Sequence, residues 1–165
     1  MSDTGRWALP LLDAGQAQKE MTHNEALATL DLLAHPSVAA VAVNTPPADP
    51  AAGQCWIVGS APTGAWAGRA GTLAGWTAGG WRFVQPREGL QAWSIVDGVP
   101  ATYVTGQWRL GRIAASELVI GGMPVVGGRR PAIAAPAGGA APDLEARAAL
   151  TQIIATLVAH GLIAA

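Results

Sequence analysis

The stretch TLAGWTAGGWRFV, residues 72–84, decides the fold that the sequence predicts. Its two ends, TLAGW and WRFV, are rich in residues that suit extended strands. They flank TAGG at 77–80, where glycines supply the positive φ angles that tight turns need. The stretch therefore predicts a β-hairpin. Alternation along WRFV places Trp81 and Phe83 on one inward face and Arg82 on the opposite face.

Further short strands are predicted on both sides of this hairpin. SVAAVAV (37–43) and CWIVG (55–59) are separated by a Pro- and Gly-rich turn region at 46–54. LQAWSIV and PATYV flank Asp97-Gly98, a strong turn signal, and QWRLG follows them. Alternation in LQAWSIV predicts that Trp93 points inward. The regular spacing predicts a mainly β fold, with a small antiparallel domain of sandwich or barrel type over residues 37–120.

The N-terminal segment, residues 1–36, is predicted to contain one short helix. Thr22 and Glu25 have the spacing of a capping box, in which each side chain bonds the backbone amide of the other residue. Leu27 and Leu30 follow at helical spacing, and Pro36 forbids continuation. The pattern predicts a helix of three turns from about residue 23 to 34.

The C-terminal part of the chain divides into a linker and a second helix. Residues 121–142 are rich in Gly, Ala and Pro, so we expect an extended linker. In residues 143–165, Asp143 is a suitable N-cap and Gly161 a suitable residue to end the helix. The apolar positions between them form one stripe, which consists of Leu150, Ile153, Ile154, Leu157 and Val158.

An isolated helix of this length is marginal in water, so its stripe needs a partner. The stripe can pack on copies of itself, dock on a different protein, or fold back on its own body. Ile and Leu at near-heptad spacing suit a parallel bundle of three or more helices. The favoured expectation is therefore a homo-oligomer, with a trimer preferred.

Composition excludes several classes of protein. Charged residues are 13% of the chain and the net charge is −1, so no basic field for nucleic acid is expected. No apolar run is long enough to span a bilayer, and the first residues do not have the pattern of a secretory signal. We expect synthesis in the cytoplasm. Cys55 is the single cysteine and is expected to be a small core residue.

The aromatic residues are mostly tryptophan: seven, against one Phe and one Tyr. Large indoles can supply the bulk of a core that alanine cannot fill. Alternatively, some can project from the sheet and stack on sugar rings. Core packing is the favoured interpretation for each tryptophan, and Trp66, in TGAWAG, is the best candidate for exposure. Trp66, Trp76 and Arg69 are accordingly the candidate carbohydrate-binding residues.

Catalytic and metal-binding patterns are weak. Glu20, His23, Glu25, Asp31 and His35 do not have the spacing of metal ligands, and no paired cysteines exist. Glu88 and Asp97 are the acids of the β segment that a polysaccharide hydrolase would have to use. Asp97 is explained as a turn residue, so no catalytic residue, metal or cofactor is predicted and the chain is not expected to be an enzyme.

Several motifs, in the same order along the chain, resemble a small alphaproteobacterial domain family of unknown function. The first is the opening run, formed by Leu9, Pro10, Leu12, Gly15, Gln16, Ala17, Gln18, Lys19, Asn24, Glu25, Ala26, Leu27, Leu30 and Asp31. Pro47, Pro50 and Gly53 before WIVG, then TGAWAG, GGWRFVQPREG and AW at 92–93, continue the resemblance over about residues 8–110. The terminal helix is also similar to those appended to phage tail-fibre proteins.

That family occurs in prophage tail or fibre proteins and in gene transfer agents. The resemblance implies a structural subunit of a phage-like particle, a head spike or a tail fibre, that contributes to host-cell attachment. Its partners would be its own copies, other capsid or fibre proteins and possibly host capsular polysaccharide. The particle would be assembled in the bacterial cytoplasm and released by lysis. Gln16, Gln18, Lys19, Asn24 and Glu25 would then be structural residues.

Overall fold

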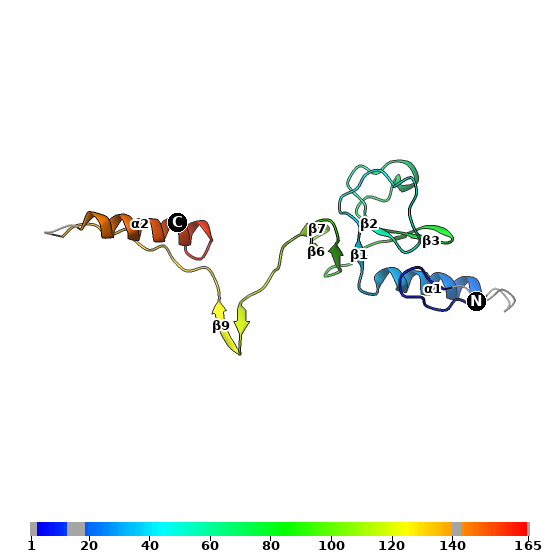
Figure 1. Cartoon of the computed structure of the whole chain (residues 1–165), viewed down its shortest axis with the longest axis horizontal. Coiled ribbons are helices and arrows are strands. Elements are labelled where there is room, and N and C mark those ends of the chain that lie inside the picture. Colours follow the sequence, from blue (N-terminus) through cyan, green and yellow to red (C-terminus); the bar gives the residue numbers. More distant parts are fainter. Residues whose placement is uncertain (1–2, 13–18, 140–142, 165) are drawn as a thin grey trace. The chain divides into compact units, whose positions relative to one another are not determined.

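The structure is a computed structural model that describes residues 3–12, 19–139 and 143–164, with the exception of the Lys19 side chain (Figure 1). The chain divides into two compact units: unit 1, Met1–Arg112, and unit 2, Ile113–Ala165. Nine strands in three small sheets and one α-helix near each end are found in the described residues. The prediction of a mainly β fold with helical ends is confirmed, although no sheet closes into a barrel.

Unit 1 consists of one helix and two sheets. Its elements are α1 (Lys19–Leu33), β1 (Ser37–Val38), β2 (Cys55–Ile57), the 3-10 turn η1 (Gly64–Trp66), β3 (Leu73–Thr77), β4 (Gly80–Val84), β5 (Gln91–Ser94), β6 (Val99–Val104) and β7 (Gln107–Leu110). One sheet has the order β2-β3-β4, and the other has the order β1-β5-β6-β7. All strand pairs are antiparallel except β1 with β5.

The β2-β3-β4 sheet is covered on both faces. Residues that pair across its strands share a face, so Ile57 lies beside Leu73 on one side, and Trp56 beside Ala74 on the other. All four are buried. The first face packs against Leu32 of α1 and against the second sheet, and the other faces a cluster of tryptophans. A strand buried on both faces explains why CWI carries no polar residue.

Helix α1 packs on this sheet through Leu32, which is fully buried. Gly75 of β3 lies directly beneath it. A Cβ at position 75 would lie within 3.0 Å of Leu32 Cγ and closer still to both Leu32 methyl carbons. Gly75 is therefore the residue that lets the helix approach the sheet closely.

Both predicted hairpins are confirmed. In the first, Trp76 pairs with Trp81 and Thr77 with Gly80, so the turn falls at residues 78–79. In the second, Ser94 pairs with Val99, and Gly98 has a φ of 65°. The strand predicted at 37–43 is shorter, because β1 ends at Val38. Beyond it the chain bonds β2 irregularly, with Ala39 N–H donating to the Cys55 carbonyl at 2.8 Å.

The predicted start of the first helix is wrong. Helix α1 begins at Lys19, so Thr22 lies inside it and the capping box does not form. The Glu25 carboxylate instead binds Arg82 of β4. Thr22 and Glu25 have the spacing of a capping box, but Glu25 forms a long-range ion pair with Arg82 instead.

Unit 2 contains a hairpin and a helix. The hairpin joins β8 (Leu118–Ile120) to β9 (Met123–Val126), and the helix is α2 (Leu144–Ala159). The expected linker over 121–142 is therefore corrected: its first residues form the hairpin turn and β9. Gly121 and Gly122 have φ angles of 57° and 81°, which suit a two-residue type I′ turn.

The ends of α2 are those the sequence predicts. The Asp143 carboxylate accepts from the Ala146 N–H at 2.9 Å. At the other end, Gly161 has a φ of 72° and its N–H donates to the Val158 carbonyl, while the Leu162 N–H donates to Leu157. These two bonds form a Schellman motif. Local residue choices therefore fix both helix ends.

Residues 130–138, which follow β9, form hydrogen bonds with both ends of this helix. Arg130 N–H donates to the Leu162 carbonyl at 2.9 Å, and Ala164 N–H donates to the Arg130 carbonyl at 2.7 Å. The Arg147 guanidinium donates to the carbonyls of Pro136 and Gly138. These contacts hold the segment along α2 through backbone groups. They leave most of the helix surface uncovered.

We predict that Gly75→Ala destabilises unit 1 by ~1–3 kcal/mol, because the added methyl group overlaps Leu32. Thermal unfolding followed by tryptophan fluorescence measures the change. In a Leu32→Ala background the same substitution should have little effect, since the clashing methyl groups are absent. Equal effects of Gly75→Ala in both backgrounds would show that the close approach does not limit this position.

Candidate functional site

Asp31 organises the N-terminal segment of unit 1. Its buried carboxylate accepts from Thr4 Oγ1 at 2.7 Å and from the backbone N–H groups of Arg6 at 3.0 Å and Trp7 at 2.7 Å. The Arg6 guanidinium donates to carbonyls at the end of α1, including that of His35 at 2.9 Å. Helix ends leave such carbonyls unpaired, so Arg6 satisfies them. The first residues are thus fastened along α1.

A second set of hydrogen bonds joins the N-terminal segment to α1, nearer the first residues of the helix. The Asn24 side chain accepts from the Leu12 N–H at 2.9 Å and donates to the Leu12 carbonyl at 3.0 Å. This paired contact supports the predicted structural role of Asn24. Gln16 and Gln18 lie outside the described residues, as does the side chain of Lys19.

Glu25 and Arg82 join α1 to the β3–β4 hairpin. Arg82 Nη2 donates to Glu25 Oε1 at 2.6 Å, and Arg82 Nε donates to Oε2 at 2.7 Å. This two-bond geometry is favourable for guanidinium and carboxylate. The hydrogen bonds from Arg82 lower the pKa of Glu25 despite a small opposing effect of burial. The same bonds raise the pKa of Arg82.

A small cavity of about 190 Å³ lies between the N-terminal segment, α1 and the β3–β4 turn. Trp76, Asn24, Asp31, Glu25 and Arg82 contribute to its lining. Glu25 and Arg82 bond each other, and the Asp31 carboxylate bonds Thr4 and the backbone, while Asp3 also lines the cavity. The cavity therefore forms part of the packing between these segments, with no free charge directed into it among those five residues.

Four of the seven tryptophans form one connected cluster. Trp81 contacts Trp56, Trp66 and Trp76 with ring centroids 5.0–5.6 Å apart, mostly edge to face. Such geometry is favourable for aromatic pairs. Trp66, the candidate for exposure, is 0% exposed, so the favoured interpretation as a core residue is confirmed. The loop that carries Trp66 folds over the sheet, so glycines beside an indole do not indicate exposure here.

The other two candidate sugar-binding residues flank this cluster. Trp76 is half-buried, and its ring lies 5.0 Å from that of Trp81. The Arg69 guanidinium lies 5.0 Å from the centre of the Phe83 ring, a cation–π contact. With Trp66 buried, the three residues do not present a shared indole platform.

One indole that the sequence assigned to the inward face of its strand is exposed. Trp93 is 46% exposed, so the prediction that it points inward is wrong. It borders a shallow cavity of about 170 Å³ together with His35, Pro36, Gln91 and Pro100. Pro100 is its cross-strand partner. Trp93 lies on the outer face because the opposite face of β5 packs small residues, Ala92 and Ser94, into unit 1.

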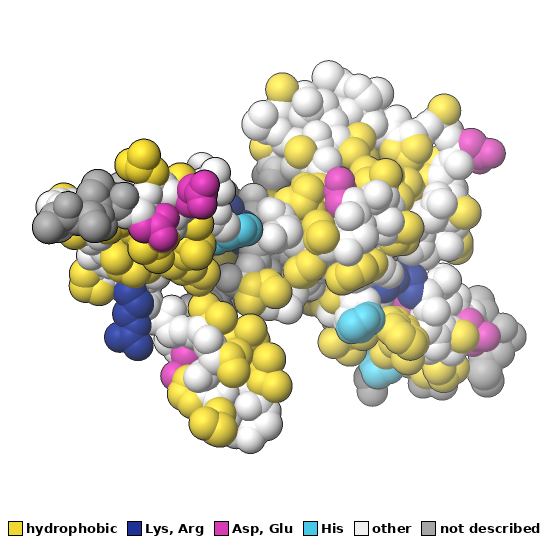
Figure 2. Space-filling model, turned by 60° about the vertical axis from the view of Figure 1, so that its left-hand side comes forward, with side chains coloured by type: hydrophobic (Ala, Val, Ile, Leu, Met, Phe, Trp, Pro, Cys, Tyr) yellow, Lys and Arg dark blue, Asp and Glu magenta, His cyan; other side chains and the backbone are white. Residues whose placement is uncertain are grey.

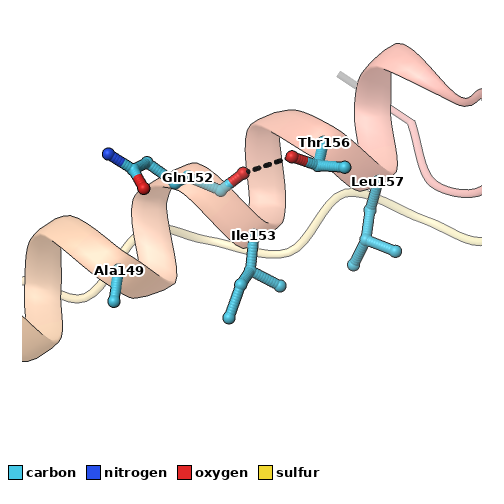
Figure 3. Close-up of a pocket in the computed structure, with 5 residues that line it drawn as sticks. All are labelled: Ala149, Gln152, Ile153, Thr156 and Leu157. Carbon is cyan, nitrogen blue, oxygen red and sulfur yellow. Dashed lines mark hydrogen bonds between the residues drawn. The ribbon is translucent and has the colours of Figure 1, made fainter.

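Helix α2 carries the most extended apolar stripe of unit 2. Leu150 and Ile153 are exposed, whereas Ile154, Leu157 and Val158 are half-buried. Figure 3 shows Ala149, Ile153 and Leu157 pointing to the same side of the helix, where they line a shallow hollow. Gln152 and Thr156 lie on the adjacent side, and Thr156 Oγ1 donates to the Gln152 carbonyl at 2.9 Å. The predicted residues thus share one continuous face.

Cys55 is buried, and Glu88 and Asp97 are hydrogen-bonded within unit 1. Desolvation raises the pKa of the Cys55 thiol to about 11. The Glu88 carboxylate accepts from the Thr105 N–H, and Ser94 Oγ donates to Asp97. Within the described ranges no group of three His, Cys, Asp or Glu residues could hold a metal ion. None of the helices described there has the length and hydropathy of a membrane span.

Comparison with known families identifies the family to which unit 1 corresponds. A family model described as a protein of unknown function (DUF2793) matches residues 23–109, which is more than half of the chain. The chain belongs to this family. The DUF2793 match begins in α1 and ends in β7, so it covers both sheets of unit 1. No curated protein matches the chain.

We predict that Glu25→Gln lowers the free energy of unfolding at pH 7 by less than about 1 kcal/mol, because the ion pair is partly exposed. The pKa of Glu25 is lower in the folded chain than in the unfolded chain, so its carboxylate stabilises the fold at pH values above its unfolded pKa of about 4.3. This stabilisation is lost as the pH falls through the folded pKa. The two proteins should therefore converge as the pH falls below the folded pKa of Glu25. Urea unfolding at several pH values tests this, and a constant difference at all pH values would contradict it.

Proposed function

We propose that the chain is a structural subunit of a phage-like particle, a head spike or tail fibre, that acts as a base or adaptor and contributes to host attachment. Two observations support the proposal. The motifs of unit 1 resemble the phage and gene transfer agent family introduced above, and α2 presents an apolar stripe that is only partly covered. The particle would be assembled in the bacterial cytoplasm and released by lysis.

The stripe is the observation that carries the proposal. Leu150, Ile153 and Leu157 have the spacing of successive a and d positions in a heptad. Ile153 is 54% exposed, although burying such a side chain stabilises by about 1.5–3 kcal/mol. Copies of α2 that pack along this stripe would cover it in a parallel bundle, for which we favour a trimer. Capsid or fibre proteins are the further partners.

We predict that Ile153→Lys weakens self-association of the full chain at least about tenfold, because it places a charge in the proposed helix interface. Light scattering after size-exclusion chromatography, over a range of concentrations, measures the mass. Ala148→Lys adds the same charge at an exposed position on the other side of α2 and should have no effect. A monomeric wild-type chain, or equal behaviour of both variants, would reject the bundle.

The particle role has its own test. A chain truncated before Asp143 should be absent from purified particles, whereas the full chain should be present. Immunogold labelling of particles then locates the subunit. Truncated chains that enter particles normally would contradict an assembly role for α2, and a full chain that is missing from particles would contradict the proposed function.

A second candidate function is carbohydrate binding, and the exposure of Trp93 favours it. Its indole borders the shallow cavity on the outer face of β5, where Gln91 offers an amide and His35 an imidazole. Apolar faces of sugar rings can pack on such an indole while amides bond hydroxyls. We propose Trp93, in place of Trp66, as the residue that contacts host capsular polysaccharide if the chain recognises it directly.

We predict that Trp93→Ala reduces retention on host capsular polysaccharide at least about tenfold, because the stacking surface is lost. Affinity electrophoresis in gels that contain the polysaccharide measures retention. Leu110→Ala, an exposed truncation on β7, serves as the control and should migrate like the wild type. Absence of retention for the wild-type chain would leave the structural role alone.

A further inference from the structure

The β8–β9 hairpin has an unusual composition for an exposed element. Its sequence, LVIGGMPVV at 118–126, contains no polar or charged side chain. Ile120 and Met123 are 62% and 70% exposed, and Val125 is also exposed. In Figure 2 the lobe at the bottom, which corresponds to the hairpin of Figure 1, shows hydrophobic side chains among white backbone atoms, with an acidic side chain at its edge. Two-stranded hairpins alone are at best marginal in water, so this one needs a cover.

Both faces of the hairpin are uncovered. Cross-strand pairs share a face, so Ile120 and Met123 lie on one side, and Val119 and Pro124 lie on the other. Val119 is 48% exposed. A single flat partner can cover one of these faces. Covering both faces therefore needs two neighbours.

Pro124 determines how a neighbour can approach. Ile120 and Met123 flank the two-residue turn and exchange backbone hydrogen bonds, so the backbone groups of the next pair, Val119 and Pro124, point outward. Proline has no N–H, so the outer edge of β9 cannot accept an added strand in the regular pattern. Growth into an open sheet is blocked on this edge. Neighbours must instead contact the side-chain faces.

Unit 2 provides no cover of its own. In the described residues of this unit, Ile163 is the one hydrophobic side chain that is buried, while at least twelve large ones are exposed. One side of a standard protein interface contains about 20–30 residues, so twelve large apolar side chains could form much of one. A segment with regular secondary structure but without a core of its own needs cover from outside the segment.

We propose that the β8–β9 hairpin packs face to face between two other copies of the same chain, so that the assembly contains at least three copies. This inference rests on the self-association proposed for α2 and adds a second interface to it. Copies of the chain are the occupant because each one brings the same uncharged faces. A cyclic arrangement lets every hairpin have two neighbours.

The test compares one substitution on each face. Val119→Glu and Ile120→Glu in the full chain should each weaken association at least about tenfold, because each buries a charge without a partner. Ser116→Glu, an exposed position just before β8, is the control and should leave the mass unchanged. Native mass spectrometry of the wild type should give three or more copies.

Several outcomes would overturn the inference. A wild-type chain that is a monomer or a dimer would do so. So would a mass that changes with the substitution on one face but not with the substitution on the other. If both hairpin variants keep their mass while Ile153→Lys dissociates, the hairpin inference fails and the α2 interface stands. All seven tryptophans lie in unit 1, so their fluorescence reports its folding, and circular dichroism at helical wavelengths reports α1 and α2 together. The milder Ile120→Thr should show a smaller change in the same direction.

Discussion

Unit 1 depends on the close approach of Leu32 to Gly75. Where the helix needs to meet the sheet, β3 has a residue without a side chain, and the Leu32 side chain fills that space completely. The helix covers one face of β2-β3-β4, so the tryptophan cluster on the other face completes a sheet that is buried on both sides. Asp31, next to Leu32, then fastens the N-terminal segment from the same turn of α1.

The elements that the sequence predicts well are those fixed by neighbouring residues. Asp97-Gly98 and the glycines at 79–80 determine their hairpins, and Asp143 and Gly161 determine the ends of α2. Each of these signals depends on the backbone conformation of one residue or on a hydrogen bond to a residue three or four positions away in the sequence. Such preferences act before any tertiary contact, which is why they can be read without a structure.

Long-range contacts explain what the sequence did not predict. Glu25 has a suitable local partner, but its carboxylate binds Arg82, 57 residues away. Alternation correctly separates the two faces of β5, yet it cannot show which face the rest of the chain covers, so Trp93 was assigned to the wrong side. The Gly-, Pro- and Val-containing hairpin at 118–126 has the composition of a linker as well as that of a strand pair, and pairing between strands decides between them.

The order of the two units along the chain has a consequence for biosynthesis. Proteins are made from the N-terminus, and domains generally fold as they leave the ribosome. Unit 1, with its own core, can therefore complete its folding while the apolar hairpin and α2 are still being translated. The exposed apolar side chains of unit 2 therefore emerge after unit 1, when its residues are already compact and no longer offer them a non-native target.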